Sequence, residues 1–314
     1  MTGTAYCGDV ITDAELVALE TEVQLALASG DRSGLDLRGF GVTSVVLAAP
    51  IDQPRVACKR VPPFRDRATF DRYRDIVLRN IDELRAVGVD VIDTDVRLIE
   101  HDGRLVGYVV QPLLDAESLG EHVLANAEPS PIHPLVTTIV EYVLSATTER
   151  RGLDAQLGNW AVIDGTVSLL DVTTPFLFGA DGHLEMDLDV FLDSGPPLLR
   201  PVYRRELPTT LRRWTDPRYS LLDLVGNLYK LDLDEWVEPI IEATAGRVDP
   251  PITVADARRH YGGEVRTWTM LHRVMTGYEW WRRRIRRATP NGFLPPPDYD
   301  PAAWKAKQRS WAAR

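Results

Sequence analysis

The sequence predicts an α+β protein with a small antiparallel sheet in its first part and a larger, mainly helical second part. Short runs of β-branched residues, separated by glycine-containing turns, are concentrated before residue 112. Beyond about residue 185, apolar residues recur every three or four positions, which is the spacing of amphipathic helices. A strand-rich part followed by a helix-rich part favours an α+β fold with two lobes.

The chain begins with a predicted helix over residues 12–29. Thr12 and Glu15 have the spacing of a capping box, in which each side chain bonds to the backbone of the other residue. Four apolar residues then fall on one helical face: Leu16, Leu19, Val23 and Leu27. We therefore expect residues 1–33 to form a helical extension before the first lobe.

The first lobe is predicted to span residues 34–112. Residues 39–49 and 55–61 are β-type runs, and we expect them to form three strands with a glycine turn. A helix over residues 66–87 follows, and Gly88 ends it.

Asp-Gly turns predict two hairpins. Asp102-Gly103 separates the last two apolar runs of the first lobe, and Asp164-Gly165 separates two runs within residues 160–170. Asp-Gly between apolar runs is the strongest short hairpin signal, because both residues tolerate the left-handed backbone of a type I′ turn.

The second lobe is predicted to span residues 113–290 and to be mainly helical. A long apolar helix over residues 131–149 precedes the second hairpin. Three further helices are expected at 219–230, 233–244 and 264–287. Residues 291–314 form a proline-rich tail that we expect to run irregularly over the surface.

Bulk properties exclude several classes of function. The 314 residues carry a formal net charge of −10, which disfavours nucleic-acid binding. No apolar run is long enough to span a membrane, and the first residues lack the pattern of a secretory signal. Two cysteines far apart, Cys7 and Cys58, fit a reducing compartment. We expect a cytoplasmic protein that binds neither nucleic acid nor membrane.

One group of polar residues has the order that phosphoryl transfer requires. Asp154 and Asn159 are spaced as D-x-x-x-x-N, and Asp171 follows the second strand of the hairpin after them. A hairpin brings the ends of its strands together, so Asn159 and Asp171 are expected to share one magnesium ion. Asp154 is expected to orient an acceptor hydroxyl or take its proton.

The first lobe supplies candidates for binding phosphate. The run Val56-Ala57-Cys58-Lys59 predicts a strand that carries a phosphate-binding lysine. Upstream, three small residues are expected to form a loop over the phosphates, because small side chains let the backbone approach phosphate oxygens: Gly39, Gly41 and Ser44.

These motifs, spread over residues 35–175, resemble the protein-kinase-like superfamily, and most closely its small-molecule branch of aminoglycoside, choline and fructosamine kinases. The resemblance implies a two-lobed kinase-like fold, ATP and Mg²⁺ as cofactors, and Lys59 and Asp154 as catalytic residues. It also implies that the backbone at Gln111 and Leu113 meets adenine. For the helix-borne acidic partner of the lysine, Asp75 and Glu83 are rival candidates.

Three departures from the family pattern affect the functional prediction. Ser44 replaces the third glycine of the loop, Gly152 stands where a histidine is usual, and Asp171 is followed by Val172 rather than phenylalanine. The predicted function is ATP-dependent phosphotransfer to a hydroxyl of a small molecule. A pseudokinase that binds a protein partner, and a nucleotidyl transferase on the same fold, remain alternatives.

Two further features are assigned structural roles. The six histidines show no metal-ligand spacing and are expected on the surface or in the core. The run of tryptophans and arginines at 280–287 could bind an anionic surface or nucleic acid. We expect instead an arginine-rich helix end, with Trp281 and Ile285 in the core.

Overall fold

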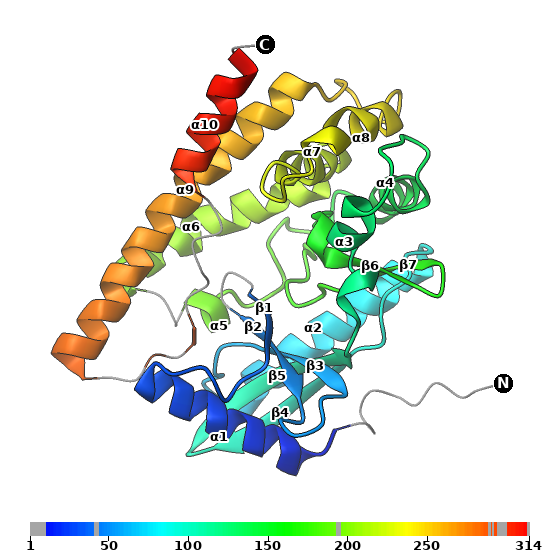
Figure 1. Ribbon diagram of the computed structural model, residues 1–314. Coiled ribbons are helices and arrows are strands. Elements are labelled where there is room, and N and C mark those ends of the chain that lie inside the picture. Colours follow the sequence, from blue (N-terminus) through cyan, green and yellow to red (C-terminus); the bar gives the residue numbers. More distant parts are fainter. Residues whose placement is uncertain are drawn as a thin grey trace.

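The computed structural model describes residues 11–40, 44–192, 196–287, 290, 292–293 and 300–312. It has an α+β fold, as the sequence predicts, built from one antiparallel sheet and many helices (Figure 1). The sheet has the order β1-β2-β3-β5-β4. Its strands are β1 (Leu37–Phe40), β2 (Val45–Ala49), β3 (Val56–Arg60), β4 (Asp95–His101) and β5 (Arg104–Pro112). A separate two-stranded ribbon pairs β6 (Trp160–Ile163) with β7 (Thr166–Leu169).

Helices surround the sheet and make up most of the second half of the chain. The α-helices are α1 (Asp13–Ser29), α2 (Arg67–Ala86), α3 (Gly120–Ala125), α4 (Pro134–Ala146), α5 (Asp189–Leu192), α6 (Arg200–Leu211), α7 (Pro217–Asn227), α8 (Val237–Ala243), α9 (Val254–Trp281) and α10 (Pro301–Ala312). Short 3₁₀ turns are η2 (Ala116–Ser118), η3 (Leu157–Asn159), η4 (Pro197–Leu199), η5 (Arg212–Thr215) and η6 (Asp234–Trp236), and η7 (Arg282–Arg286) is a π-helical turn after α9.

Helix α1 lies across one face of the sheet (Figure 1). The capping box that the sequence predicts is present, since Thr12 and Glu15 exchange side-chain to backbone hydrogen bonds. Its apolar face shares a core with strand residues that include Leu47 and Val56. The predicted helical extension is therefore part of the folded core, and its residues 13–29 pack on one face of the sheet.

The opposite face of the sheet joins a second and larger core. Helix α2 contributes apolar residues to this core together with α4, α7, α8 and the start of α9. Side chains alternate along β3, because successive residues of a strand point to opposite faces. Val56 and Cys58 therefore pack in the core under α1, while Lys59 points to the other face, toward the helical part of the molecule.

Both predicted hairpins are confirmed. Asp102 and Gly103 have φ of 49° and 71°, and Asp164 and Gly165 have φ of 50° and 81°. Two successive positive φ values are the geometry of a type I′ turn, which matches the twist of the strands it joins. The second hairpin fixes the positions of the loops before β6 and after β7, and these two loops build the site described below.

Helix α9 extends well beyond the core it begins in (Figure 1). Val265 is buried, but Trp281 is 38% exposed and Ile285 is 61% exposed. The prediction that both pack in the core was wrong, because this end of the helix projects past the other described helices. None of the described helices combines the length and the apolar composition needed to cross a membrane.

The expectation of an irregular tail was also wrong for residues 301–312, which form α10. Trp304 is buried against Tyr229 and Tyr261, and this contact anchors the helix along the first turns of α9. Lys307 adds ion pairs to Asp232 and Asp234. The three successive prolines at 295–297 lie outside the described residues.

Candidate functional site

A lysine of the sheet and an aspartate of a helical-side loop form the centre of the candidate site. Lys59 Nζ lies 2.7 Å from Asp171 Oδ2, and the two residues are 112 positions apart in the chain. The Lys59 side chain is only 15% exposed. Strand β3 positions the lysine, and the end of β7, two residues earlier, positions the aspartate.

The loop before β6 brings Asp154 and Asn159 to the same place. Asp154 Oδ1 accepts a hydrogen bond from the Gln156 backbone N–H, which closes an Asx turn. Asn159 Nδ2 donates to the Asp154 carbonyl, and the Leu170 N–H donates to the Asn159 carbonyl. The backbone pairing of Asn159 with Leu170 sets the asparagine beside Asp171, as the hairpin in the sequence predicts.

The pKa values of the two aspartates in the site shift in opposite directions. Burial acts to raise the pKa of Asp171, but the Lys59 charge and hydrogen bonds from Lys59 and Thr173 outweigh it and lower that pKa. Burial raises the pKa of Asp154, and the charges of Asp223 and Asp171 raise it further. Asp171 is therefore the stable anion, while Asp154 has the greater tendency to take a proton.

The predicted adenine-binding backbone is already hydrogen-bonded within the protein. The Leu113 N–H donates to the Arg55 carbonyl at 3.3 Å, and Gln111 lies opposite Ala57 in the ladder between β3 and β5. The Gln111 side chain donates to the Leu170 carbonyl at 2.7 Å, which ties the sheet to the residue before Asp171. Gln111 therefore joins the two parts of the site, and an adenine that accepted from the Leu113 N–H would displace an internal bond.

Neither candidate for the acidic partner on α2 contacts Lys59. Asp75 pairs with its neighbour Arg74, and Glu83 lies beside Arg79 and Arg151. Asp171 takes the place of the expected helix acid. The helix acid is absent from the site because α2 directs Tyr73, rather than a carboxylate, toward it. The Tyr73 hydroxyl donates a hydrogen bond to the Thr173 carbonyl.

Part of the predicted phosphate loop is described. Gly39 lies in β1 opposite Val46, next to an irregularity in the strand register, and Ser44 immediately precedes β2. Gly41 lies outside the described residues. The two strands that flank the predicted loop, β1 and β2, are therefore paired at one edge of the sheet that carries Lys59 in its third strand.

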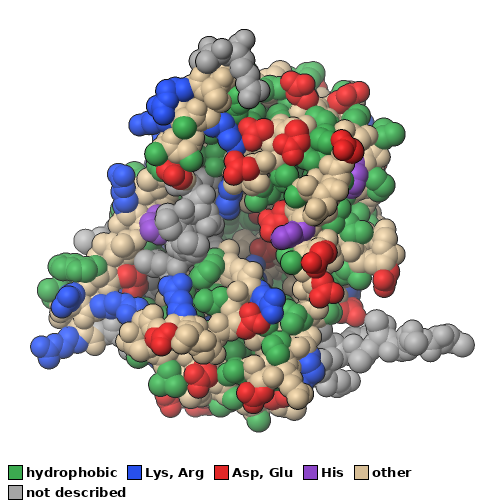
Figure 2. All heavy atoms as spheres, in the orientation of Figure 1, with side chains coloured by type: hydrophobic (Ala, Val, Ile, Leu, Met, Phe, Trp, Pro, Cys, Tyr) green, Lys and Arg blue, Asp and Glu red, His purple; other side chains and the backbone are tan. Residues whose placement is uncertain are grey.

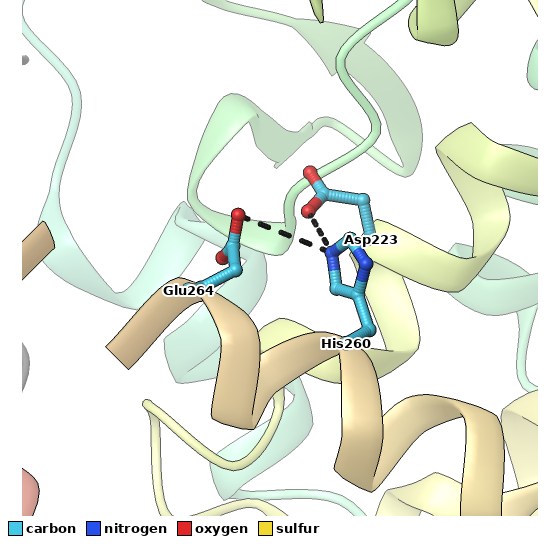
Figure 3. A group of neighbouring side chains, drawn as sticks. All are labelled: Asp223, His260 and Glu264. Carbon is cyan, nitrogen blue, oxygen red and sulfur yellow. Dashed lines mark hydrogen bonds and ion pairs between the residues drawn. The ribbon is translucent and has the colours of Figure 1, made fainter. Parts of the chain in front are cut away.

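A second polar cluster lies next to the loop of Asp154, and sequence reasoning missed it. Asp223 on α7 and His260 on α9 are in contact, with 2.7 Å between Asp223 Oδ1 and His260 Nε2, and Glu264 Oε1 lies 4.0 Å from the same nitrogen (Figure 3). Gln156 Nε2 donates to the other oxygen of Asp223 at 3.0 Å. The spacing of His260 and Glu264, four residues apart on one helix, is the signal that could have indicated them.

The protonation of His260 depends on its burial and on the two carboxylates beside it. Asp223 is fully buried and accepts a hydrogen bond from the Asn227 amide as well as from Gln156. Burial lowers the pKa of His260, but the hydrogen bond to Asp223 and the charges of Asp223 and Glu264 outweigh it and raise that pKa. The histidine ring therefore carries positive charge more readily than usual, between two carboxylates.

The surface is hollowed between the part that carries α1 and the sheet and the helical part above it (Figure 2). Acidic side chains gather on the helical part next to this recess. The pair of Lys59 and Asp171 joins these two parts, since β3 belongs to the sheet and β7 to the helical side.

The fold and the site define an α+β protein in which a sheet lysine pairs with Asp171, next to a loop that carries a second aspartate and an asparagine. The chain belongs to a family described as "Family of unknown function (DUF6206)", which matches residues 18–278. The match includes the lysine site and the cluster on α7 and α9. No curated protein matches the sequence.

Proposed function

We propose that the protein is a Mg-ATP-dependent phosphotransferase that acts on a hydroxyl group of a small molecule. The observation that carries the proposal is the ion pair of Lys59 with Asp171, beside Asn159 and Asp154. These four residues have the order and spacing that resemble small-molecule kinases. A five-stranded antiparallel sheet followed by helices is compatible with the two-lobed, kinase-like architecture that we propose.

Each residue has a distinct role in this proposal. The Lys59 ammonium binds phosphate oxygens of ATP and holds the nucleotide against the sheet. Asp154 accepts the hydrogen bond of the acceptor hydroxyl and takes its proton as the new oxygen–phosphorus bond forms and ADP leaves. The raised pKa of Asp154 suits it to that proton transfer.

The donor set also fits a magnesium ion. An amide oxygen from Asn159 and a carboxylate from Asp171 are the oxygen ligands that Mg²⁺ prefers. When bound there, the ion neutralises phosphate charge. Asp171 is the better of the two aspartates for this role, because the Lys59 charge and hydrogen bonds from Lys59 and Thr173 keep its pKa low.

Thermal unfolding with and without millimolar Mg-ATP tests the nucleotide site. A ligand at about 100 times its dissociation constant stabilises a protein by about 2.7 kcal/mol, which raises Tm measurably. We expect a rise for the wild type and a much smaller one for Lys59→Met and Asp171→Asn. Asp75→Asn is the matched control, because Asp75 is an acidic residue on α2 that pairs with Arg74 away from the site. If the wild type does not respond to Mg-ATP, the proposal fails.

An acceptor screen then tests the transfer step. Asp154→Asn should keep the Tm rise with Mg-ATP and lose transfer to any hydroxyl substrate that the wild type accepts. The mass of the product separates phosphate transfer from nucleotidyl transfer, since the second adds AMP. The expected partners are ATP and a small-molecule acceptor in the cytoplasm, without nucleic acid or membrane.

Two observations favour a second candidate, a pseudokinase that acts as a binding module. Lys59 pairs with Asp171 rather than with an acid on α2, and the Leu113 N–H is already bonded to Arg55. For a nucleotide to bind as it does in the protein-kinase-like superfamily, Lys59 would have to change its partner and the Leu113 N–H would have to leave the Arg55 carbonyl. A wild type that binds Mg-ATP without turnover on any hydroxyl substrate, and that captures a protein partner, would favour this candidate.

A further inference from the structure

We propose that Asp223, His260 and Glu264 form a binding site for a divalent transition-metal ion, best matched by Zn²⁺. The proposal does not depend on the phosphotransferase proposal, because it uses different residues. One ligand atom from each side chain lies within 4.8 Å of the others. Figure 3 shows the three side chains converging from two helices, with Asp223 on α7 and the other two on α9.

The chemistry of the donors selects the class of ion. One imidazole nitrogen and two carboxylate oxygens form a mixed nitrogen and oxygen set, which suits zinc and related ions better than magnesium. Ligand atoms on a tetrahedral zinc ion are about 3.3 Å apart, given bonds of about 2.0–2.2 Å. The observed separations from His260 Nε2, 2.7 Å to Asp223 and 4.0 Å to Glu264, lie on either side of that value. The third separation, between the Asp223 and Glu264 oxygens, is within 4.8 Å. Side-chain shifts of up to about 1.5 Å would therefore accommodate the ion.

A fourth side chain at the cluster has an unused ligand atom. Asn227 is 2% exposed, and its amide lies 3.2 Å from Asp223 Oδ1. The amide nitrogen faces Asp223, while Oδ1 has no hydrogen-bond partner among the described residues. Rotating the amide by half a turn would place Oδ1 beside the Asp223 carboxylate. That orientation also breaks the 2.9 Å hydrogen bond from Nδ2 to the Asp223 backbone carbonyl, so it requires a cation on the Asp223 carboxylate that takes the amide oxygen as a ligand.

The position of the site indicates what the ion would do. Side-chain exposure is 0% for Asp223, 10% for His260 and 16% for Glu264, which leaves little room for a substrate. Asp223 also accepts a hydrogen bond from Gln156, which lies two residues after Asp154. A bound ion would therefore join α7 to α9 and hold the loop that carries Asp154, as a structural rather than a catalytic metal.

Zinc titration of the chelator-treated protein, with any purification tag removed, tests the site. We expect the wild type to bind one Zn²⁺ per chain in competition with a chromophoric chelator, and Zn²⁺ but not Mg²⁺ to raise Tm. Co²⁺ at the site should give the visible absorption of a tetrahedral complex. His260→Gln and Glu264→Gln should each weaken binding by at least about tenfold, since even the loss of an outer-shell partner costs that much.

Two controls make the outcome decisive. His122→Gln changes an exposed histidine on α3, and Asp171→Asn changes the lysine site, and both should bind Zn²⁺ as the wild type does. Far-UV circular dichroism verifies that each variant is folded, and Glu264→Gln replaces the least buried of the three ligands. Zinc binding that survives both ligand variants, or that is lost with Asp171→Asn instead, overturns the proposal, as does a wild type that binds no zinc.

Discussion

Replacing Glu20 with alanine should destabilise the protein strongly, because this residue fixes α1 to the sheet through a buried ion pair. Glu20 is fully buried and Arg60 is 3% exposed. The glutamate accepts hydrogen bonds from Arg60 at 2.7 and 2.8 Å, and from Tyr108 and Gln24 at 2.6 Å each. All four bonds are lost in Glu20→Ala, and the buried Arg60 loses its ion pair with Glu20.

The expected magnitude follows from the loss of this buried ion pair. Breaking a buried ion pair by removing one partner costs about 3–5 kcal/mol. The buried hydroxyl of Tyr108 also loses its acceptor, so the upper half of this range is the better expectation. Replacing both charges with apolar residues, in Glu20→Met with Arg60→Met, should recover most of the loss, because both members of the buried ion pair are then removed.

Urea unfolding measures these differences. Tryptophan fluorescence and circular dichroism should report one coincident transition, and the midpoint multiplied by its slope gives the free energy of unfolding. Glu22→Ala is the matched control, since Glu22 lies on the same helix and forms no ion pair with a described residue. Its effect should stay within about 0.5 kcal/mol. A loss below about 1 kcal/mol for Glu20→Ala would refute the reasoning, as would a double variant no more stable than the single one.

Four other predictions concern stability. Burial acts to raise the pKa of Glu20, but hydrogen bonding and charge from Arg60 outweigh it and lower that pKa below 4.5. The ionised form stabilises the fold fully above pH 4.5, so the stability advantage of the wild type over Glu20→Gln should shrink as the pH falls below 4.5. Gly107→Ala should cost about 1–3 kcal/mol in urea unfolding, because a Cβ there would lie 2.7 Å from the Phe64 ring. Gly263→Ala, in open space within α9, should be neutral or stabilising by up to roughly 1 kcal/mol. Tyr73→Phe should cost about 1–3 kcal/mol, because a buried carbonyl loses its donor, and an unchanged Tm would contradict this.

Features that depend on a few neighbouring residues could be predicted from the sequence. The capping box of Thr12 and Glu15 formed as expected, because both partners lie within one helical turn. The two Asp-Gly hairpins also formed, since their turn type is decided by two residues that tolerate positive φ. Helix α9 began ten residues before the start that we expected, at the capping box of Thr253 with Asp256.

The lysine site was predicted in part. The order of Lys59, Asp154, Asn159 and Asp171 indicated one site, and the structure brings the lysine onto Asp171. The acidic partner could not be chosen, because α2 carries acidic residues on several faces and only its packing decides which face meets the sheet. That packing places Tyr73 at the site and leaves Asp75 and Glu83 with arginine partners.

By itself, the sequence determined the α+β class, the hairpins, the first helix and the order of the site residues, because these follow from local periodicity and turn chemistry. Only the tertiary structure decided which distant residues meet. Asp223 and His260 are 37 positions apart and come together because α7 packs on α9. Trp281 is partly exposed because α9 extends beyond the core, whereas Trp304 in the tail is buried. Burial and long-range pairing depend on how whole elements pack, and no local pattern carries that information.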